Sequence, residues 1–185
     1  MKKKTKKKKK VSSPAVKLLK FTMFVLLVLV ATYFMVNYGF RRTVVHNVSM
    51  QETLYDGDNI IMDEFTYFVS DPKRFDVICF KNYEEKELII KRIIGLPGET
   101  VRISDGEIFI NEKKIRDKAG LGDIEEAGRA SFGVTLSEDE YFVLGDNREK
   151  SIDSRYGSIG NVKKQDILGK AVLVIWPINR IKIIN

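Results

Sequence analysis

Two residues of this chain, Ser49 and Lys91, could form a hydrolase site without a catalytic histidine. Serine is a weak nucleophile at neutral pH and needs an adjacent base. The one histidine, His46, lies three positions before Ser49, and neighbouring positions on one short segment rarely align two side chains for proton transfer. Lys91 lies 42 positions after Ser49 and is the better candidate base.

The residues around Lys91 predict a strand that buries it. Residues 88–94 read Leu-Ile-Ile-Lys-Arg-Ile-Ile. Because strand side chains alternate between two faces, Lys91 shares an apolar face with Ile89 and Ile93, whereas Arg92 points the opposite way. Burial lowers a lysine pKa from its reference value of about 10.4 towards about 7 or 8, where the neutral amine can act as a base. The alternative is an exposed edge that leaves the ammonium in water, as for most lysines.

A loop rich in hydrogen-bonding side chains is predicted after the apolar residues 141–144. Residues 145–155 read Gly-Asp-Asn-Arg-Glu-Lys-Ser-Ile-Asp-Ser-Arg. Such a loop could supply a hydroxyl that orients a neutral lysine amine, and a carboxylate–arginine pair that holds the loop in place. An elaborate turn would use the same residue types, so the loop alone does not decide between the two interpretations.

An apolar run near the N-terminus predicts a membrane anchor. Residues 21–40 carry no formal charge, and at about 1.5 Å per residue a helix of this length crosses a bilayer. A cleaved signal peptide has a shorter apolar region of about 7 to 15 residues and a small-residue cleavage site, whereas this run ends in aromatic residues and two arginines. We predict an uncleaved anchor at 21–40 after a polybasic tail at 1–20, with the N-terminus in the cytoplasm and residues 43–185 outside.

The charge distribution and the cysteine count exclude several classes of protein. Residues 1–42 contain twelve basic and no acidic residues, whereas residues 43–185 contain 20 basic and 25 acidic residues, a net charge of −5. This argues against a folded domain that binds nucleic acid. A single cysteine, Cys79, excludes an intramolecular disulfide and a cysteine-based metal site, and its apolar neighbours predict a buried strand position. We expect neither a metal nor a cofactor.

The remainder of the chain predicts a mostly β domain. Short segments rich in β-branched and aromatic residues alternate with turns rich in glycine and aspartate. The predicted strands are residues 59–62, 76–80, 88–94, 100–103, 107–110, 141–144 and 169–176. Asp105-Gly106 predicts a hairpin between the fourth and fifth of these strands. Short helices are predicted near residues 123–127 and 163–167.

These segments, together with the anchor, resemble the bacterial type I signal peptidases, the Ser/Lys-dyad enzymes of peptidase family S26. Residues 49–58, 76–78, 91–99 and 145–155 carry the resemblance in this order. It implies a catalytic domain of coiled antiparallel β-sheets with a small cap inserted at about residues 102–140, a fold shared with soluble self-cleaving regulators. It also implies a membrane-anchored serine endopeptidase that cleaves signal peptides from exported preproteins with small residues one and three positions before the cut.

The resemblance assigns roles to five residues of the predicted site. Ser49 is the nucleophile, and Lys91 is the general base that later returns the proton to the leaving amine. Ser151 is the hydroxyl that orients Lys91, and Asp153 with Arg155 is the supporting pair.

Two residues differ from the family pattern. Asn47 stands where the family often has a serine whose hydroxyl stabilises the oxyanion together with the backbone N–H of Ser49; an amide can also donate, with altered geometry. Glu52 stands where the family usually has a proline, and we expect it to change loop rigidity rather than to react. Two apolar residues near the nucleophile, Met50 and Leu54, are expected to contact the substrate and to seat the domain at the lipid surface.

Other classes of protein compete with this interpretation. A non-catalytic relative that binds export substrates would be expected to lack the serine or the lysine; only Asn47 and Glu52 favour it. A sortase-type transpeptidase needs a cysteine nucleophile with a histidine, and Cys79 with His46 does not provide this pair. A self-cleaving regulator would be soluble and would carry a DNA-binding domain. The expected partners are exported preproteins and membrane lipid, with no nucleic acid.

Overall fold

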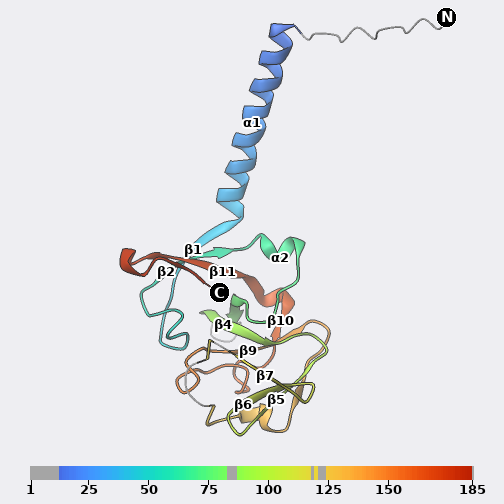
Figure 1. Ribbon diagram of the computed structural model, residues 1–185, viewed down its shortest axis with the longest axis vertical. Coiled ribbons are helices and arrows are strands. Elements are labelled where there is room, and N and C mark those ends of the chain that lie inside the picture. Colours follow the sequence, from blue (N-terminus) through green and yellow to red (C-terminus); the bar gives the residue numbers. More distant parts are fainter. Residues whose placement is uncertain (1–12, 83–86, 118, 121–123, 185) are drawn as a thin grey trace, which may run out of the picture. The chain divides into compact units, whose positions relative to one another are not determined.

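The computed structural model describes residues 13–82, 87–117, 119–120 and 124–184, so most of the predicted polybasic tail lies outside the described residues. The chain divides into two compact units, Met1–Asn37 and Tyr38–Asn185. The first unit contains a long helix and the second contains the β-strands (Figure 1).

The helix α1 extends over Pro14–Tyr38. Proline is favourable at a first helical position, and the preceding Ser13 accepts the backbone N–H of Val16 with its carbonyl oxygen at 3.0 Å. Within α1, Pro14–Tyr33 is long and apolar enough to cross a membrane, with a mean hydropathy of 2.1. The helix begins before the predicted anchor at 21–40 and ends before Phe40, which pairs in a strand. The residues that cross the membrane stay a prediction.

The second unit is built around an eight-stranded sheet in which all pairings are antiparallel. Seven strands follow the order β1 (Phe40–Val44), β2 (Asn59–Asp63), β11 (Ile167–Trp176), β3 (Val77–Asn82), β4 (Glu87–Gly95), β9 (Glu140–Leu144) and β10 (Val162–Lys163), and β12 (Lys182–Ile183) pairs with β11. The predicted mostly β class is confirmed.

A separate four-stranded sheet is formed between residues 100 and 135, and it overlaps the region at about 102–140 where the cap is predicted. Its order is β7 (Lys113–Ile115), β6 (Glu107–Ile110), β5 (Thr100–Ser104) and β8 (Val134–Thr135). The predicted hairpin is present between β5 and β6, where Asp105 and Gly106 have φ angles of 52° and 77°. Positive φ at both central residues gives the twist that a tight hairpin requires.

The remaining helical segments are short. They are α2 (Thr66–Val69), η1 (Gly128–Ser131), η2 (Lys164–Asp166) and η3 (Ile178–Arg180). The helix predicted near 163–167 is the 3-10 turn η2. Part of the helix predicted near 123–127 lies outside the described residues, and the 3-10 turn in this region begins only at Gly128.

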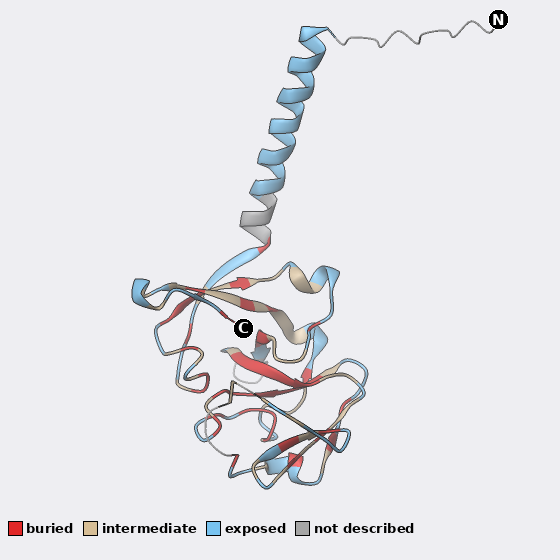
Figure 2. Cartoon of the chain, viewed as in Figure 1, coloured by how far each residue is buried: buried red, intermediate tan, exposed pale blue. Residues whose placement is uncertain are grey.

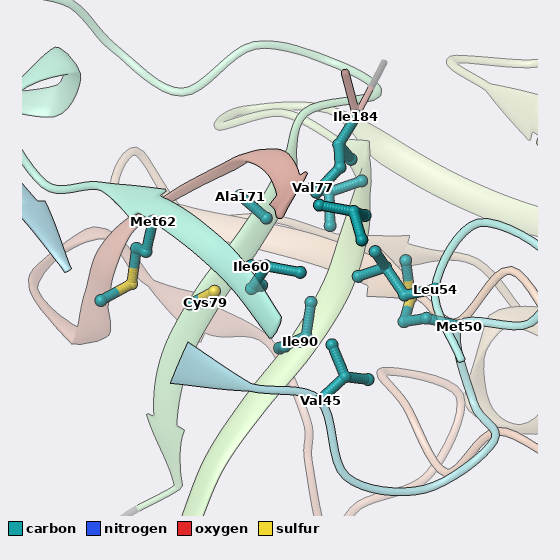
Figure 3. Close-up of a cluster of buried hydrophobic side chains, with 11 residues drawn as sticks. Val45, Met50, Leu54, Ile60, Met62, Val77, Cys79, Ile90, Ala171 and Ile184 are labelled. Carbon is teal, nitrogen blue, oxygen red and sulfur yellow. The ribbon is translucent and has the colours of Figure 1, made fainter. Parts of the chain in front are cut away.

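Buried apolar side chains form a core on the large sheet (Figures 2 and 3). In one cluster, Met50 and Leu54 pack with Val45, Ile60 and Ile90. Their exposures are 1% and 0%, so the expectation that they seat the domain on lipid is wrong. Apolar residues in a loop that folds back over a sheet gain more from filling its core than from facing outward. Cys79 is fully buried in the same cluster, as predicted.

Candidate active site

Strand β4 positions Lys91 in the interior of the second unit. Lys91 lies opposite Ile78 of β3, and the next residue, Arg92, lies opposite Leu144 of β9. Lys91 is 4% exposed, so the predicted burial is confirmed and the alternative of a solvated edge lysine is wrong. Side-chain alternation sends Lys91 and Arg92 to opposite faces of β4.

Ser49 lies in the segment between β1 and β2, where the chain turns tightly. The backbone N–H of Leu54 donates to the carbonyl oxygen of Met50 at 2.7 Å, and the N–H of Gln51 donates to Val48 at 3.2 Å. The buried side chains of Met50 and Leu54 hold this turn against the sheet. The packed turn brings Ser49 Oγ to 2.6 Å from Lys91 Nζ, within hydrogen-bond distance.

The surroundings of Lys91 favour its neutral form. Burial among apolar atoms lowers the pKa of Lys91 to about 8, and the positive charge of Arg155 acts in the same direction. The carboxylates of Asp153 and Asp146 oppose this lowering. At pH 7 about one molecule in ten would then carry a neutral amine, far more than for a lysine in water.

Asn147 forms hydrogen bonds that fix the backbone at Val48 and Ser49. Its N–H donates to the carbonyl oxygen of Ser49 at 3.0 Å, and its side-chain amide donates to Val48 at 3.3 Å. Gly145 lies just before it, and a Cβ atom there would come within 2.5 Å of the Ser49 carbonyl oxygen and of Ser151 Cβ. The close approach of the two segments therefore requires glycine at this position.

Asp153 and Arg155 form a buried ion pair in the predicted loop. Arg155 Nε donates to Asp153 Oδ1 at 2.8 Å and its Nη2 donates to Oδ2 at 2.9 Å, a forked geometry. Asp153 also accepts the N–H of Gly145 at 3.1 Å, which connects the pair to the segment beside Ser49. Ser151 Oγ is buried without a hydrogen-bond partner in the described part of the chain, so its contact with Lys91 stays a prediction.

A second buried ion pair was not predicted from the sequence. Arg92 Nε and Nη2 donate to the two carboxylate oxygens of Asp146 at 2.9 Å and 2.8 Å, and Arg92 Nη1 donates to Phe75 O at 2.8 Å. Asp146 also accepts the hydroxyl of Thr53, four residues after the nucleophile. The Arg92–Asp146 pair therefore connects the face of β4 opposite Lys91 with the turn that carries Ser49 and with the loop at residues 145–155. Its signal in the sequence was a basic residue that shares a strand face with Ile90 and Ile94, together with a later loop that contains acidic residues.

A cleft of about 790 Å³ opens over Ser49 and Lys91. Its walls are formed by residues 42–50 and 88–91 and by Lys150, Ile152, Ser158 and Ile159, so Met50 contributes to it and Leu54 does not. Asn47 lines the cleft with a left-handed φ of 70°, and its N–H donates to Asp56 Oδ1 at 2.9 Å. The lining includes the basic side chains of Arg42, Lys91 and Lys150 and no carboxylate. His46 also lines it.

This arrangement places a serine hydroxyl and a lysine amine together at the wall of an open cleft. A serine with an adjacent base can attack a carbonyl carbon and form a covalent acyl intermediate. Among the described residues no group of three or more His, Cys, Asp or Glu side chains is arranged to bind a metal. The adjacent hydroxyl of Ser49 and amine of Lys91 are a combination that can support acyl transfer.

Several known proteins are similar to this chain in sequence. Residues 17–176 match the family model described as signal peptidase, peptidase S26. Signal peptidase I P from Bacillus subtilis subsp. natto is 31% identical over 165 residues, covering 85% of this chain and 89% of the relative. Signal peptidase I from Bacillus amyloliquefaciens is 35% identical over 153 residues, covering 79% and 81%. A solved signal peptidase I from Enterococcus faecalis V583 is 34% identical and covers 55% of this chain and 97% of its own, with a TM-score of 0.46.

Proposed function

Because this chain belongs to the signal peptidase I family of serine endopeptidases, we propose that it cleaves signal peptides with Ser49 as nucleophile and Lys91 as general base. The observation that carries the proposal is the 2.6 Å distance between Ser49 Oγ and Lys91 Nζ in a buried setting. A neutral amine at this distance can take the serine proton, whereas an ammonium cannot.

The reaction proceeds in two acyl-transfer steps. Ser49 Oγ attacks the carbonyl carbon of the scissile bond while Lys91 Nζ takes the hydroxyl proton. Lys91 then gives this proton to the leaving amine, and the C–N bond breaks to leave an ester on Ser49. A water molecule attacks the ester carbon and loses a proton to Lys91, which passes it to the departing Ser49 oxygen. The enzyme returns to its starting state.

The oxyanion of each tetrahedral intermediate is stabilised by the backbone N–H of Ser49 and by the side-chain amide of Asn47. Asn47 lines the same cleft as Ser49, and its N–H bond to Asp56 holds its backbone in place. Its amide group is an adequate hydrogen-bond donor. Ser151 and the Asp153–Arg155 pair act on the position of Lys91 and of the loop beside Ser49, and they do not touch the reacting atoms.

The substrate is an extended segment of an exported preprotein that adds as a strand beside β4 or β1. Strand β9 pairs with β4 only from Arg92 to Gly95, and residues 88–90 line the cleft without a partner strand on that side in the described chain. Strand β1 is at the end of the sheet order and also lines the cleft. In an added strand, alternate side chains enter pockets two positions apart, which matches small residues one and three positions before the cut.

The helix α1 anchors the enzyme in the cell membrane, with the polybasic N-terminus in the cytoplasm and the peptidase domain outside. Pro14–Tyr33 has the length and hydropathy of a membrane span. Ten lysines within residues 1–20, against two arginines directly after the apolar run, favour this orientation. Exported preproteins emerge on the outer side, where the cleft would meet them.

The test is cleavage of a preprotein with an Ala-x-Ala site by the detergent-solubilised full chain. We expect one cut after the second alanine, identified by the mass of both products, and no cut by Ser49→Ala. A preprotein with leucine in place of that second alanine is the substrate control and should stay intact. If folded wild type binds the first preprotein and never cuts it, the chain is a substrate-binding relative rather than a peptidase.

A further inference from the structure

The segment that carries Ser49 has no helix or strand of its own to fix its position. It is the loop of residues 45–58 between β1 and β2, all of them described, and we call it the nucleophile loop. The backbone N–H of Val45 donates to the carbonyl oxygen of Asp58 at 2.8 Å, which joins the two ends of the loop. Because Ser49 and Asn47 lie within it, their positions depend on contacts with other segments of the chain.

One such contact comes from Arg180, the last residue of η3. Its Nη2 donates to Asp58 Oδ2 at 3.0 Å, and its guanidinium carbon lies 3.6 Å from the centre of the Tyr55 ring. The side chain of Asp58 is 1% exposed and that of Arg180 is 26% exposed, so the arginine covers a buried carboxylate at the edge of the loop. An ion pair and a cation–π contact therefore hold the same guanidinium against the nucleophile loop.

The carboxylate that Arg180 covers also shapes the end of the loop. Asp58 Oδ2 accepts the backbone N–H of Tyr55 at 2.9 Å, and the N–H of Asp58 donates to the carbonyl oxygen of Tyr55 at 3.0 Å. Asp56 lies inside this turn, and its Oδ1 accepts the N–H of Asn47 at 2.9 Å. A chain of contacts thus connects Arg180 with the residue two positions before the nucleophile.

The residues that follow Arg180 contact the same loop. Lys182 Nζ donates to the carbonyl oxygen of Glu52 at 3.4 Å. Ile184 is 4% exposed and belongs to the buried cluster that contains the two apolar residues of the loop (Figure 3). The intervening Ile181 and Ile183 are 55% and 71% exposed. Because alternate side chains of an extended chain share a face, this segment presents one face to the nucleophile loop.

From these contacts we propose that Arg180 is a positioning residue for cleavage, which acts through Tyr55 and Asp58 to hold Ser49 at its distance from Lys91. The inference rests on the proposed function, because it needs Ser49 to be the nucleophile. Arg180 is not among the described residues that line the cleft, so it acts without touching the substrate. A displacement of reacting atoms by about 1 Å can cost on the order of 10² in rate, so a contact that fixes the loop affects turnover.

The experiment measures amide hydrogen exchange and cleavage kinetics of the full chain in detergent. Arg180→Ala removes the ion pair and the ring contact together. Arg102→Ala is the matched control, because Arg102 also pairs with a carboxylate, that of Glu112, and lies 4.7 Å from the centre of an aromatic ring, that of Phe109. Arg102 belongs to β5 of the four-stranded sheet rather than to the segment that contacts the nucleophile loop.

In Arg180→Ala we expect faster exchange in peptides from residues 46–58 and unchanged exchange in peptides from residues 100–115. A merely structural role would speed exchange in both regions, because the whole unit would open more often. The kcat for a soluble preprotein-derived peptide should fall at least about tenfold while KM changes less than about threefold, since the displacement acts on the reacting atoms. Arg102→Ala should retain the wild-type kcat and the wild-type exchange at residues 46–58.

A second variant, Arg180→Lys, keeps a cation beside Asp58 and lacks the planar guanidinium that lies over Tyr55. It should recover part of the lost kcat. If Arg180→Ala does not fold, Arg180→Lys replaces it, with the same local increase in exchange and a smaller fall in kcat.

Three results in the folded variant would overturn the inference: a wild-type kcat, unchanged exchange at residues 46–58, or an equal increase in both regions. Each of them differs from failure of the proposed function, in which wild type itself does not cut the peptide. In that case the positioning role of Arg180 fails as well.

Discussion

The hydroxyl oxygen of Ser49 lies 2.6 Å from the amine nitrogen of Lys91, although the two residues are 42 positions apart and come from a turn and a strand. The turn is held by buried Met50 and Leu54, and the strand is held by its neighbours on both sides. The geometry of the dyad thus depends on core packing on one side and on sheet register on the other.

The pH dependence of cleavage should report the lowered pKa of Lys91. Because the base must be neutral, kcat/KM is expected to rise about tenfold per pH unit below the pKa and to level off above it. Burial lowers this pKa to about 8, so the midpoint should fall near pH 8. The measurement is kcat/KM for a soluble preprotein-derived peptide from pH 6 to pH 9.5.

The control for this profile is His46→Gln, since His46 also lines the cleft. An ordinary histidine titrates near pH 6.5, and a midpoint there that disappears in His46→Gln would assign the base to the histidine. We expect the midpoint to stay near pH 8 in this variant.

Gly145→Ala should reduce turnover by displacing the serine segment. The added methyl group would meet the Ser49 carbonyl oxygen and Ser151 Cβ, each at 2.5 Å, and the backbone must shift to relieve these contacts. A displacement of about 1 Å can cost on the order of 10² in rate. Gly157→Ala is the matched control, because no heavy atom lies within 4 Å of its added Cβ. Equal kcat in the two variants would contradict this role of Gly145.

Asp146→Asn should destabilise the folded domain. It leaves the guanidinium of Arg92 buried beside a neutral amide, and breaking a buried ion pair in this way typically costs about 3 to 5 kcal/mol. The free energy of unfolding in urea, measured in detergent, tests this. Glu107→Gln breaks the exposed pair with Lys114 and should change the unfolding free energy by less than about 1 kcal/mol. A similarly small change in Asp146→Asn would show that the buried pair is dispensable.

Asn47→Asp tests whether the amide of Asn47 donates to the oxyanion. Aspartate tolerates the left-handed backbone at this position but replaces the amide donor with an acceptor. Loss of one oxyanion donor lowers kcat by about 10² to 10³. Asn47→Gly retains the backbone conformation and removes the side chain, so it should show a similar loss. Full activity in Asn47→Gly would contradict a role for the Asn47 amide and would leave the backbone N–H of Ser49 as the hydrogen-bond donor to the oxyanion.

The sequence predicted the parts of the fold that depend on local patterns. The apolar alternation around Lys91 predicted its buried strand, and Asp105-Gly106 predicted the hairpin between β5 and β6. Short strands such as β1 and β12 were not predicted, because their residues become strands only through pairing with distant segments. The helix α1 does not coincide with the uncharged residues 21–40, because absence of charge does not determine where a helix begins or ends.

Long-range contacts limited the prediction of the site. The alternation of side chains along the strand correctly predicted that Arg92 lies on the face opposite Lys91. Its partner Asp146 lies 54 positions away, and no local sequence pattern identifies it. Met50 and Leu54 were expected to face lipid because they are apolar and close to Ser49 in the chain. The turn directs them into the core instead, which adjacency in sequence could not indicate.

The most direct test of the dyad compares kcat/KM for wild type, Ser49→Ala, Lys91→Ala and the double variant on one peptide. Residues that act as a unit lose activity together, so each single variant should fall by more than about 10³ and the double variant should fall no further. Lys81→Ala, an exposed lysine of β3, should match wild type. Retained activity in Lys91→Ala, or a double variant whose loss equals the product of the two single losses, would contradict a shared Ser49–Lys91 mechanism.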